Sequence, residues 1–253
     1  YYTLTWVDSR RPKVTYASSF GVSEIPASQV KKTKEYLSRF NMISVREKQG
    51  AEIVEKLTGK KAEVCCDPTV LTDRKRWDEL SGDCPFVSEK YIFCYFIGNN
   101  PTQREFVKKL AQKTGCKILA VKHIDEYIKS DDDFGDIDYL EVGPKEFVNF
   151  IRYATYVCTD SFHGTIFSIM YNKNFFTFKR FSDSQKSSMN SRVKNILSIV
   201  GLSNRLFEDS ITPEAALAYQ VDWFDVNKRL NDFRKSSREY FERAIKCLNG
   251  AQE

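Results

Sequence analysis

Histidine and long apolar runs are scarce in this chain. Only two of its 253 residues are histidine, His123 and His163, whereas zinc sites usually draw on several histidine or cysteine ligands at set spacings. The adjacent Cys65 and Cys66 do not have such a spacing, so no metal site is expected. No apolar run approaches the roughly 18 residues of a membrane-spanning helix, and the N-terminus has no signal-peptide pattern.

The net charge of the chain is also small, which limits the classes of binding partner that charge alone would attract. Lys and Arg number 39 and Asp and Glu number 34, leaving 39 − 34 = +5. This surplus is spread along the chain, so it slightly favours small anionic ligands and does not indicate nucleic acid. The seven cysteines are an odd number, and Cys94 and Cys158 lie in apolar runs as reduced thiols do. A cytoplasmic protein is expected, acting free or at the inner face of the membrane.

Short apolar runs alternate with longer helical patterns, and this alternation predicts an α/β fold with a mainly parallel sheet. Residues 81–89 contain Gly and Pro and are predicted to be a linker. The expected strands are 13–17, 42–45, 62–66, 91–97, 116–121, 156–158 and 174–178. The expected helices are 26–40, a segment ending near Gly59, 101–114, a segment starting at Pro144, 163–170 and 225–248.

Two of these helices have well-defined starts. Asn100 is an N-cap residue followed by Pro101, and Gly115 is the expected stop of the same helix. Gly143 precedes Pro144, which is followed by a glutamate in the first turn. The last helix, 225–248, has a stripe at alternating spacings of 4 and 3, which predicts one long amphipathic helix lying on the protein or on a partner. The stripe consists of Val226, Leu230, Phe233, Ser237, Tyr240, Ala244 and Cys247.

The segment Thr159-Asp-Ser-Phe-His-Gly-Thr165 is the main candidate site. It joins the carboxyl end of a strand to a helix, where ligands bind in open α/β sheets, and a helix N-terminus suits a phosphate or carboxylate. Gly164 lets a ligand approach the backbone, and His163 can transfer a proton near neutral pH. The alternative is a helix capped by Asp160 or Ser161, with His163 as an interior histidine.

Three further cations are weaker candidates. Arg46 ends a strand in Ile43-Ser-Val-Arg-Glu47 and could grip a carboxylate or phosphate with its planar fork. The alternative, which spacing alone favours, is a surface arginine paired with Glu47 or Asp67. Arg192 at a helix start and Arg180 after a strand are the others, and basic strand ends are commonly solvated.

Several motifs together resemble the polysaccharide pyruvyl transferase family. They are Ser44-Val-Arg-Glu47 before a helix, Cys66-Asp-Pro68 after a strand, Cys158-Thr-Asp-Ser-Phe-His-Gly-Thr-Ile-Phe-Ser168, and Ser191-Arg-Val193. The resemblance covers nearly the whole chain. It implies two Rossmann-like domains resembling the B-type glycosyltransferase fold, the N-terminal one incomplete because the family's first strand and Gly-rich loop have no counterpart here. The implied domains are a partial N-terminal α/β domain (1–85), a donor domain (90–205) and a helical segment crossing back to the first domain (206–253).

The reaction implied by the resemblance moves pyruvate from phosphoenolpyruvate onto two hydroxyls of a sugar, forming a ketal during exopolysaccharide biosynthesis. It needs no metal and no cofactor, since phosphoenolpyruvate is the donor substrate. His163 is then the catalytic residue, and the donor is bound by Arg46, Ser161, Phe162, Gly164, Thr165 and Arg192. Some members have an arginine where this chain has Ser161, and Arg180 or Arg192 could replace it.

Two other functions are open at this point. One is a glycosyltransferase that uses a nucleotide sugar, although residues 90–190 show no clear nucleotide signature. The other is a non-catalytic member of a polysaccharide assembly system. The acceptor sugar, which could be lipid-linked or a finished polymer, is not specified by these motifs, and a homo-oligomer is one option for the assembly.

Overall fold

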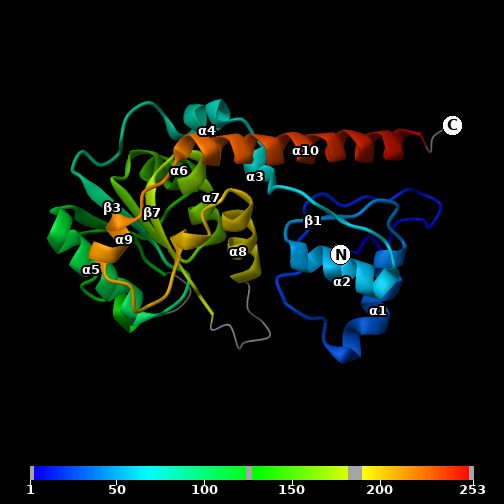
Figure 1. Cartoon of the computed structure of the whole chain (residues 1–253), viewed down its shortest axis with the longest axis horizontal. Coiled ribbons are helices and arrows are strands. Elements are labelled where there is room, and N and C mark those ends of the chain that lie inside the picture. Colours follow the sequence, from blue (N-terminus) through cyan, green and yellow to red (C-terminus); the bar gives the residue numbers. More distant parts are fainter. Residues whose placement is uncertain (1–2, 124–126, 182–189, 251–253) are drawn as a thin grey trace. The chain divides into compact units, whose positions relative to one another are not determined.

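The computed structural model describes residues 3–123, 127–181 and 190–250 (Figure 1). The chain divides into two compact units, each of which is described by itself. Unit 1 consists of residues 1–71, 183–199 and 228–253, and unit 2 of residues 72–182 and 200–227. The domain limits expected from the sequence, 1–85, 90–205 and 206–253, stay predictions, and the ends of the chain at 1–2 and 251–253 lie outside the described residues.

Unit 1 is a small α/β unit around a two-stranded parallel sheet in which Ser44 pairs with Glu63 and Val45 with Val64. Buried apolar side chains, among them Phe40, Val45 and Val54, form its core beside the sheet. Its elements are α1 (Ala27–Ser38), β1 (Ser44–Val45), α2 (Lys48–Thr58), β2 (Glu63–Val64), α3 (Pro68–Leu71), α8 (Asn190–Ile199) and most of α10 (Trp223–Asn249).

The prediction of a strand at residues 13–17 is wrong. Only two isolated parallel bridges form there, Val14 with Met42 and Ser18 with Val45. Ala17 between them has φ 46°, and this left-handed conformation interrupts the extended backbone that a continuous strand needs.

Unit 2 is a Rossmann-like fold with a six-stranded parallel sheet in the order β5-β4-β3-β6-β7-β8. Counted from β3, this is the order 3-2-1-4-5-6 of dinucleotide-binding folds. The strands are β3 (Tyr91–Tyr95), β4 (Lys117–Val121), β5 (Ile137–Tyr139), β6 (Tyr156–Thr159), β7 (Asn174–Phe178) and β8 (Leu206–Phe207). The helices are α4 (Arg74–Ser81), α5 (Pro101–Thr114), η1 (Lys129–Asp131), α6 (Pro144–Tyr153), α7 (Phe162–Met170), η2 (Ser203–Arg205) and α9 (Pro213–Ala218).

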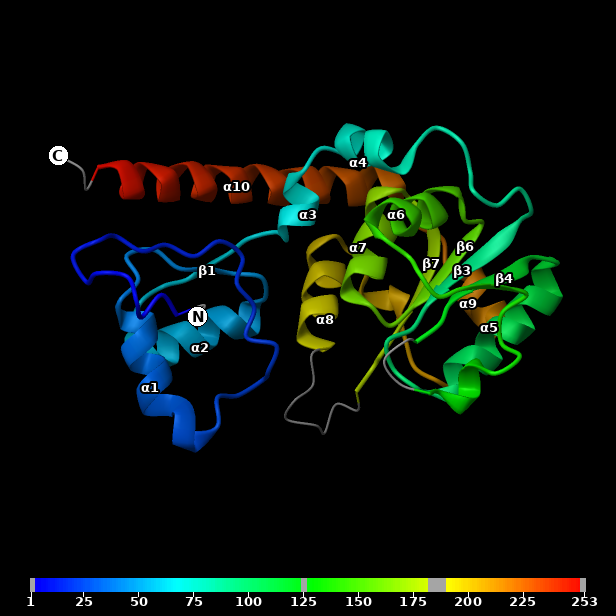
Figure 2. The ribbon, with the colours of Figure 1, turned by 180° about the vertical axis from the view of Figure 1, so that it is seen from behind.

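Helices cover both faces of this sheet (Figure 2). On one face the α5 side chains Phe106 and Leu110 pack with Ile92 and Phe178 in one buried cluster. On the other face Phe93 lies 5.7 Å from the ring of Phe147 of α6. The α/β class with parallel strands is therefore confirmed, and the near-continuous apolar strands follow from burial on both faces.

The helix ends expected from the sequence are confirmed. The Asn100 side chain accepts a hydrogen bond from the Thr102 N–H, and Gly115 closes α5 with φ 69°, a conformation that costs glycine little. The Gly143 N–H donates to Glu146 Oε2 at 3.1 Å. Residues 82–90 hold neither helix nor strand, but α4 before them and β3 after them both belong to unit 2, so the predicted linker does not divide the two units. The elements α4, β5, β8 and α9 were not predicted.

The long C-terminal helix is also confirmed. Its stripe residues Val226, Leu230, Ser237, Tyr240 and Ala244 are buried. Ser237 accepts a hydrogen bond from the Cys66 N–H at 2.9 Å, and the Tyr240 hydroxyl donates to the Thr15 carbonyl at 2.9 Å. Within the described residues, no helix combines the length and apolar character needed to cross a membrane.

Candidate functional site

The candidate site lies at the carboxyl ends of β3 and β6, the two central strands of unit 2. These strands pair in parallel, with Tyr95 opposite Thr159 at their ends. The chain continues from β3 outward through β4 and β5, and from β6 outward in the other direction. This is the switch point of the sheet, where the two adjoining loops separate and leave room for a ligand.

Asp160 follows β6 directly and organises this edge. Its carboxylate is fully buried and accepts hydrogen bonds from the Ile97 N–H at 2.7 Å and the Gly98 N–H at 2.8 Å. A Cβ at Gly98 would lie 2.9 Å from Asp160 Oδ2, so only glycine fits there without a shift. The sequence predicts Asp160 or Ser161 as the helix cap; in the structure Ser161 is the cap, and Asp160 holds the loop after β3.

Arg180, just beyond β7, brings a positive charge to the same edge. Its Nε lies 3.9 Å from Asp160 Oδ2, and its Nη2 donates to the Asp160 carbonyl at 3.4 Å. The Nε atom is buried and makes no hydrogen bond within the part of the chain that the structure describes. Burial raises the pKa of the neighbouring Tyr95, and the Arg180 charge acts to lower it. Arg180 thus brings a positive charge beside Asp160, which directly precedes the first turn of α7.

The first turn of α7 is fixed by its own side chains. Ser161 is the N-cap, and its hydroxyl accepts from the Gly164 N–H at 3.4 Å. A Cβ on Gly164 would lie 2.6 Å from Thr159 Oγ1, so this glycine is needed for close packing of helix against strand. Thr165 is buried and donates to the Ser161 carbonyl. Phe162 is also buried.

His163 differs from its neighbours because it is exposed. The alternative in which His163 is an interior histidine is therefore wrong. Its ring lies 5.4 Å from the Phe162 ring in an edge-on arrangement. Of the predicted site residues, Ser161, Phe162, His163, Gly164 and Thr165 share this turn, and His163 is the one whose side chain reaches solvent.

Arg46 belongs to unit 1, where it is held by an aspartate. Its Nη1 lies 2.9 Å from Asp67 Oδ2, and the two side chains are 19% and 3% exposed. Its Nε donates to the Ala17 carbonyl at 3.4 Å. The pairing with Asp67, one of the two partners considered for a structural arginine, is therefore present. Whether Arg46 also binds the donor stays a prediction.

Glu47, next to Arg46, was not predicted as a functional residue. It is buried, and its Oε1 accepts from the Ser19 hydroxyl and the Phe20 N–H. Oε2 is buried without a hydrogen-bond partner among the described residues. Burial raises the pKa of Glu47, while those hydrogen bonds and the charges of Arg192 and Arg46 act to lower it. Arg192 of α8 is thereby placed near Glu47 in unit 1.

A pH dependence of stability follows from this raised pKa. The folded state holds the Glu47 proton to a higher pH than the unfolded chain does, so the stability present at acidic pH is lost as the pH rises through the folded-state value. Glu47→Gln cannot titrate and keeps an oxygen for Ser19. We therefore expect the melting temperature of Glu47→Gln relative to wild type to increase between pH 4 and pH 8. Glu52→Gln, which replaces an exposed glutamate of α2, is the control. A difference in melting temperature between Glu47→Gln and wild type that stays constant from pH 4 to pH 8 would contradict the raised pKa of Glu47.

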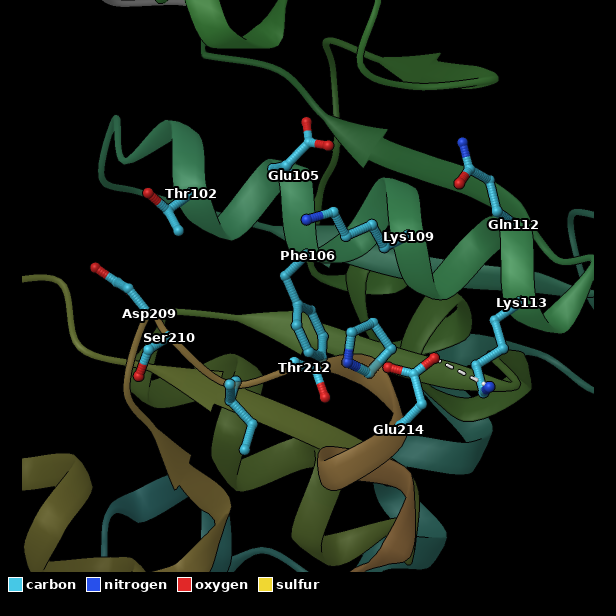
Figure 3. Close-up of a pocket in the computed structure, with 12 residues that line it drawn as sticks. Thr102, Glu105, Phe106, Lys109, Gln112, Lys113, Asp209, Ser210, Thr212 and Glu214 are labelled. Carbon is cyan, nitrogen blue, oxygen red and sulfur yellow. Dashed lines mark ion pairs between the residues drawn. The ribbon is translucent and has the colours of Figure 1, made fainter.

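A separate pocket of about 650 Å³ lies between α5 and the segment leading into α9 (Figure 3). Its rim carries charges of both signs, and Lys113 is paired with Glu214 at 3.0 Å. None of the described residues lining it is a predicted site residue. Because its charges are mixed and partly paired, the pocket does not select a ligand class.

Comparison with known proteins decides the family. The family model described as polysaccharide pyruvyl transferase matches residues 1–180. The chain belongs to the polysaccharide pyruvyl transferase family. The match includes both the Arg46 and the His163 motifs, and the resemblance drawn from these motifs is confirmed. Among curated protein sequences, none matches this chain.

Solved structures share the fold of this pyruvyl transferase family member. A Neisseria meningitidis UDP-GlcNAc 2-epimerase bound to UDP-GlcNAc is 10% identical with a TM-score of 0.51, covering 93% of this chain and 70% of its own. A Listeria monocytogenes protein assigned as a UDP-N-acetylglucosamine 2-epimerase is 11% identical with a TM-score of 0.50, covering 86% of this chain. The chain spans 60% of the length of that Listeria protein. At these identities the likeness shows the fold alone, and it agrees with the expected resemblance to B-type glycosyltransferases.

Proposed function

We propose that this chain transfers a pyruvyl group from phosphoenolpyruvate to two hydroxyls of a sugar in a polysaccharide, forming a cyclic ketal and releasing phosphate. The observation that carries the proposal is the exposed His163 in the family's motif, at the carboxyl end of a central strand. The acceptor is a sugar or oligosaccharide, either lipid-linked or part of a polymer. The non-catalytic alternative gains no support from a site whose histidine is accessible.

The two sugar hydroxyls lose two protons in this reaction: one balances the proton added to the methylene carbon, and the other leaves with the phosphate as hydrogen phosphate. Protonation of the methylene carbon of phosphoenolpyruvate creates an oxocarbenium-like centre at its neighbour. One sugar hydroxyl attacks this centre and loses its proton, and the second hydroxyl then replaces the departing phosphate and loses its own. His163 is the proton-transfer group in this scheme, because an imidazole can give and take protons near neutral pH.

The donor carries a phosphate and a carboxylate, so it needs positive partners. Arg180 supplies a guanidinium beside Asp160, and the N-terminus of α7 supplies the positive end of a helix dipole. Arg180 takes the place of the arginine that some family members have at the position of Ser161. Arg46 and Arg192 are the donor-binding cations proposed for unit 1. Removal of one such cationic side chain of the protein typically costs a few kcal/mol of transition-state stabilisation.

The test compares ligands and one conservative variant. Phosphoenolpyruvate is expected to raise the melting temperature in moderate salt, and UDP-sugars are not, because binding to the folded state alone stabilises it. Arg46→Lys is expected to weaken phosphoenolpyruvate binding about tenfold or more, since an ammonium cannot reproduce the planar guanidinium fork. Lys48→Arg, at an exposed position two residues on, is the control.

Three results would count against this proposal. A shift with UDP-sugars alone would favour the glycosyltransferase alternative. No shift with any donor, together with no ketal formation, would favour a non-catalytic member. A folded Arg46→Lys protein with wild-type affinity would restrict Arg46 to its pairing with Asp67.

A further inference from the structure

The loop between β3 and α5 has the place of the phosphate-binding loop of dinucleotide-binding folds. β3 is the first strand of the 3-2-1-4-5-6 order in unit 2. In such folds the loop after this strand presents glycines and backbone N–H groups to a pyrophosphate. The corresponding segment here is Phe96-Ile-Gly-Asn-Asn-Pro101. What its N–H groups and the open side of Gly98 contact therefore determines whether a phosphate can bind there.

A carboxylate of the protein itself binds these N–H groups. Asp160 Oδ1 accepts from the Ile97 N–H at 2.7 Å, and Asp160 Oδ2 accepts from the Gly98 N–H at 2.8 Å. The Asp160 side chain is fully buried, so water does not compete for either hydrogen bond. Successive N–H groups that converge on one anion are the means by which backbone loops bind phosphate, and here the anion is the aspartate.

The open side of Gly98 is filled as well. A Cβ at this position would lie 2.9 Å from Asp160 Oδ2 and 3.1 Å from Arg180 Cγ. In dinucleotide-binding loops the lack of a Cβ lets the pyrophosphate approach the backbone, whereas here it lets two side chains of the protein do so. A phosphate oxygen could reach the Gly98 N–H only by displacing the Asp160 carboxylate.

The start of α5 offers little to a phosphate either. Pro101 has no N–H, and the Thr102 N–H donates to the Asn100 side chain at 3.0 Å. From the opposite side of the loop, Arg104 Nη1 donates to the Gly98 carbonyl at 2.9 Å and to the Asn100 carbonyl at 3.2 Å. The N–H groups and the carbonyls of this loop are thus used within the protein.

The side chains behind the loop are fixed in turn. Arg104 is 3% exposed, and its Nε donates to Asp131 Oδ1 at 2.8 Å. The Ile97 carbonyl lies 3.1 Å from His123 Nε2. The loop is therefore held from both sides by side chains of unit 2 and needs no ligand to give it this conformation.

We propose that Asp160 is a specificity residue, because its carboxylate is a built-in anion that occupies the phosphate position of the β3–α5 loop and excludes nucleotide phosphates from it. An incoming phosphate meets both an occupied site and a like charge, and such repulsive elements are an effective way to reject a ligand. Arg180, whose Nε lies 3.9 Å from Asp160 Oδ2, offsets that charge but frees neither N–H group.

A consequence for the donor rests on the proposed function. Phosphoenolpyruvate is bound without the N–H groups of Ile97 and Gly98, by cations such as Arg180 at the same edge of the sheet. A nucleotide therefore does not compete with phosphoenolpyruvate while Asp160 is in place.

Removal of the carboxylate is expected to turn the loop into an anion site. In Asp160→Ala both N–H groups lose their acceptor, and formate reproduces the group that was removed. Formate is expected to raise the melting temperature of Asp160→Ala by a few degrees more than sodium chloride of equal ionic strength does, because it binds the folded state alone. In wild type the two salts are expected to differ less. Equal effects of the two salts on Asp160→Ala would overturn the proposal.

Asp136→Ala is the matched control for this rescue. Asp136 Oδ2 also accepts a backbone N–H, from Ile118 at 2.7 Å, but its side chain is 43% exposed. Water can replace that carboxylate, so formate is expected to have no advantage over chloride. An equal advantage in both variants would show that formate acts on the whole protein and would refute a site at the loop.

The backbone amide signals of Ile97 and Gly98 locate the bound anion. With formate, and separately with ADP, they are expected to shift saturably in Asp160→Ala and to stay in place in wild type. The wild-type measurement does not depend on the stability of Asp160→Ala. Saturable shifts of both signals when ADP or NAD is added to wild type would refute the proposal.

A kinetic measurement separates this role from the proposed function. ADP is expected to raise KM for phosphoenolpyruvate severalfold in Asp160→Ala and to leave it unchanged in wild type. Formate rescue and amide shifts without any turnover of phosphoenolpyruvate would uphold the occupied loop and reject the donor. A wild-type KM that rises with ADP, while the signals of Ile97 and Gly98 stay in place, would uphold the occupied loop and reject the consequence for donor binding.

Discussion

Replacing His163 by alanine is expected to lower the rate of pyruvyl transfer about a hundredfold or more, as loss of a general acid or base does. The melting temperature is expected to change by no more than a few degrees, because shortening an exposed side chain opens no cavity in the core. His163 is exposed in the first turn of α7. Single-turnover rates and melting temperatures measured on the same preparations check both halves of this expectation.

His163→Asn is the matched control for this substitution. Asparagine keeps a hydrogen-bonding edge but carries no titratable proton, so it should retain part of the donor affinity while losing the rate. A folded and fully active His163→Ala protein would remove the proposed proton-transfer role and leave the first turn of α7 without a catalytic assignment.

Replacing Asp160 by asparagine is expected to lower the free energy of unfolding by about 2 to 4 kcal/mol. The carboxylate accepts two backbone N–H groups while fully buried. Asparagine offers one oxygen, so its amide group faces the second N–H and leaves a buried donor unsatisfied. The loop of Ile97 and Gly98 loses one of its two hydrogen bonds to residue 160, and donor binding is expected to weaken as well. Urea denaturation at pH 7 measures the change in stability.

Asp136→Asn provides a matched control. Asp136 Oδ2 also accepts a backbone N–H, from Ile118 at 2.7 Å, but its side chain is 43% exposed. Water can replace the lost hydrogen bond there, so we expect a change of no more than about 1 kcal/mol. Equal losses in the free energy of unfolding for the two substitutions would show that burial does not determine how much Asp160 contributes to stability.

The parts of the fold that were predictable are those with local signals. Asn100 and Gly115 delimit α5 because a cap acts on backbone groups within a few residues. The stripe of α10 was visible because its burial repeats with the period of the helix itself. The strand at 13–17 was not predictable in the same way, since its apolar and β-branched residues carry no sign of the left-handed turn at Ala17.

The candidate site was located by sequence but assembled by tertiary structure. The motif around His163 placed an acid–base residue after a strand, and the family match agrees with it. Gly164 was expected to admit a ligand, whereas the structure shows that the space for its Cβ is occupied by Thr159. Thr159 is close to Gly164 in sequence, but the distance between the two residues depends on the direction in which α7 leaves β6.

The sequence by itself determined the α/β class, the main helix ends of unit 2, the amphipathic last helix and the motif that carries His163. These follow from residue periodicity and from contacts within one or two turns. Only the tertiary structure decided the partners of Asp160 and His123, because Asp160 binds an N–H 63 residues away and His123 binds a carbonyl 26 residues away. Parallel strands bring such distant segments to one edge of a sheet, and the hydrogen bonds formed there involve backbone atoms, which every residue has. The identities of the residues therefore do not predict these hydrogen bonds.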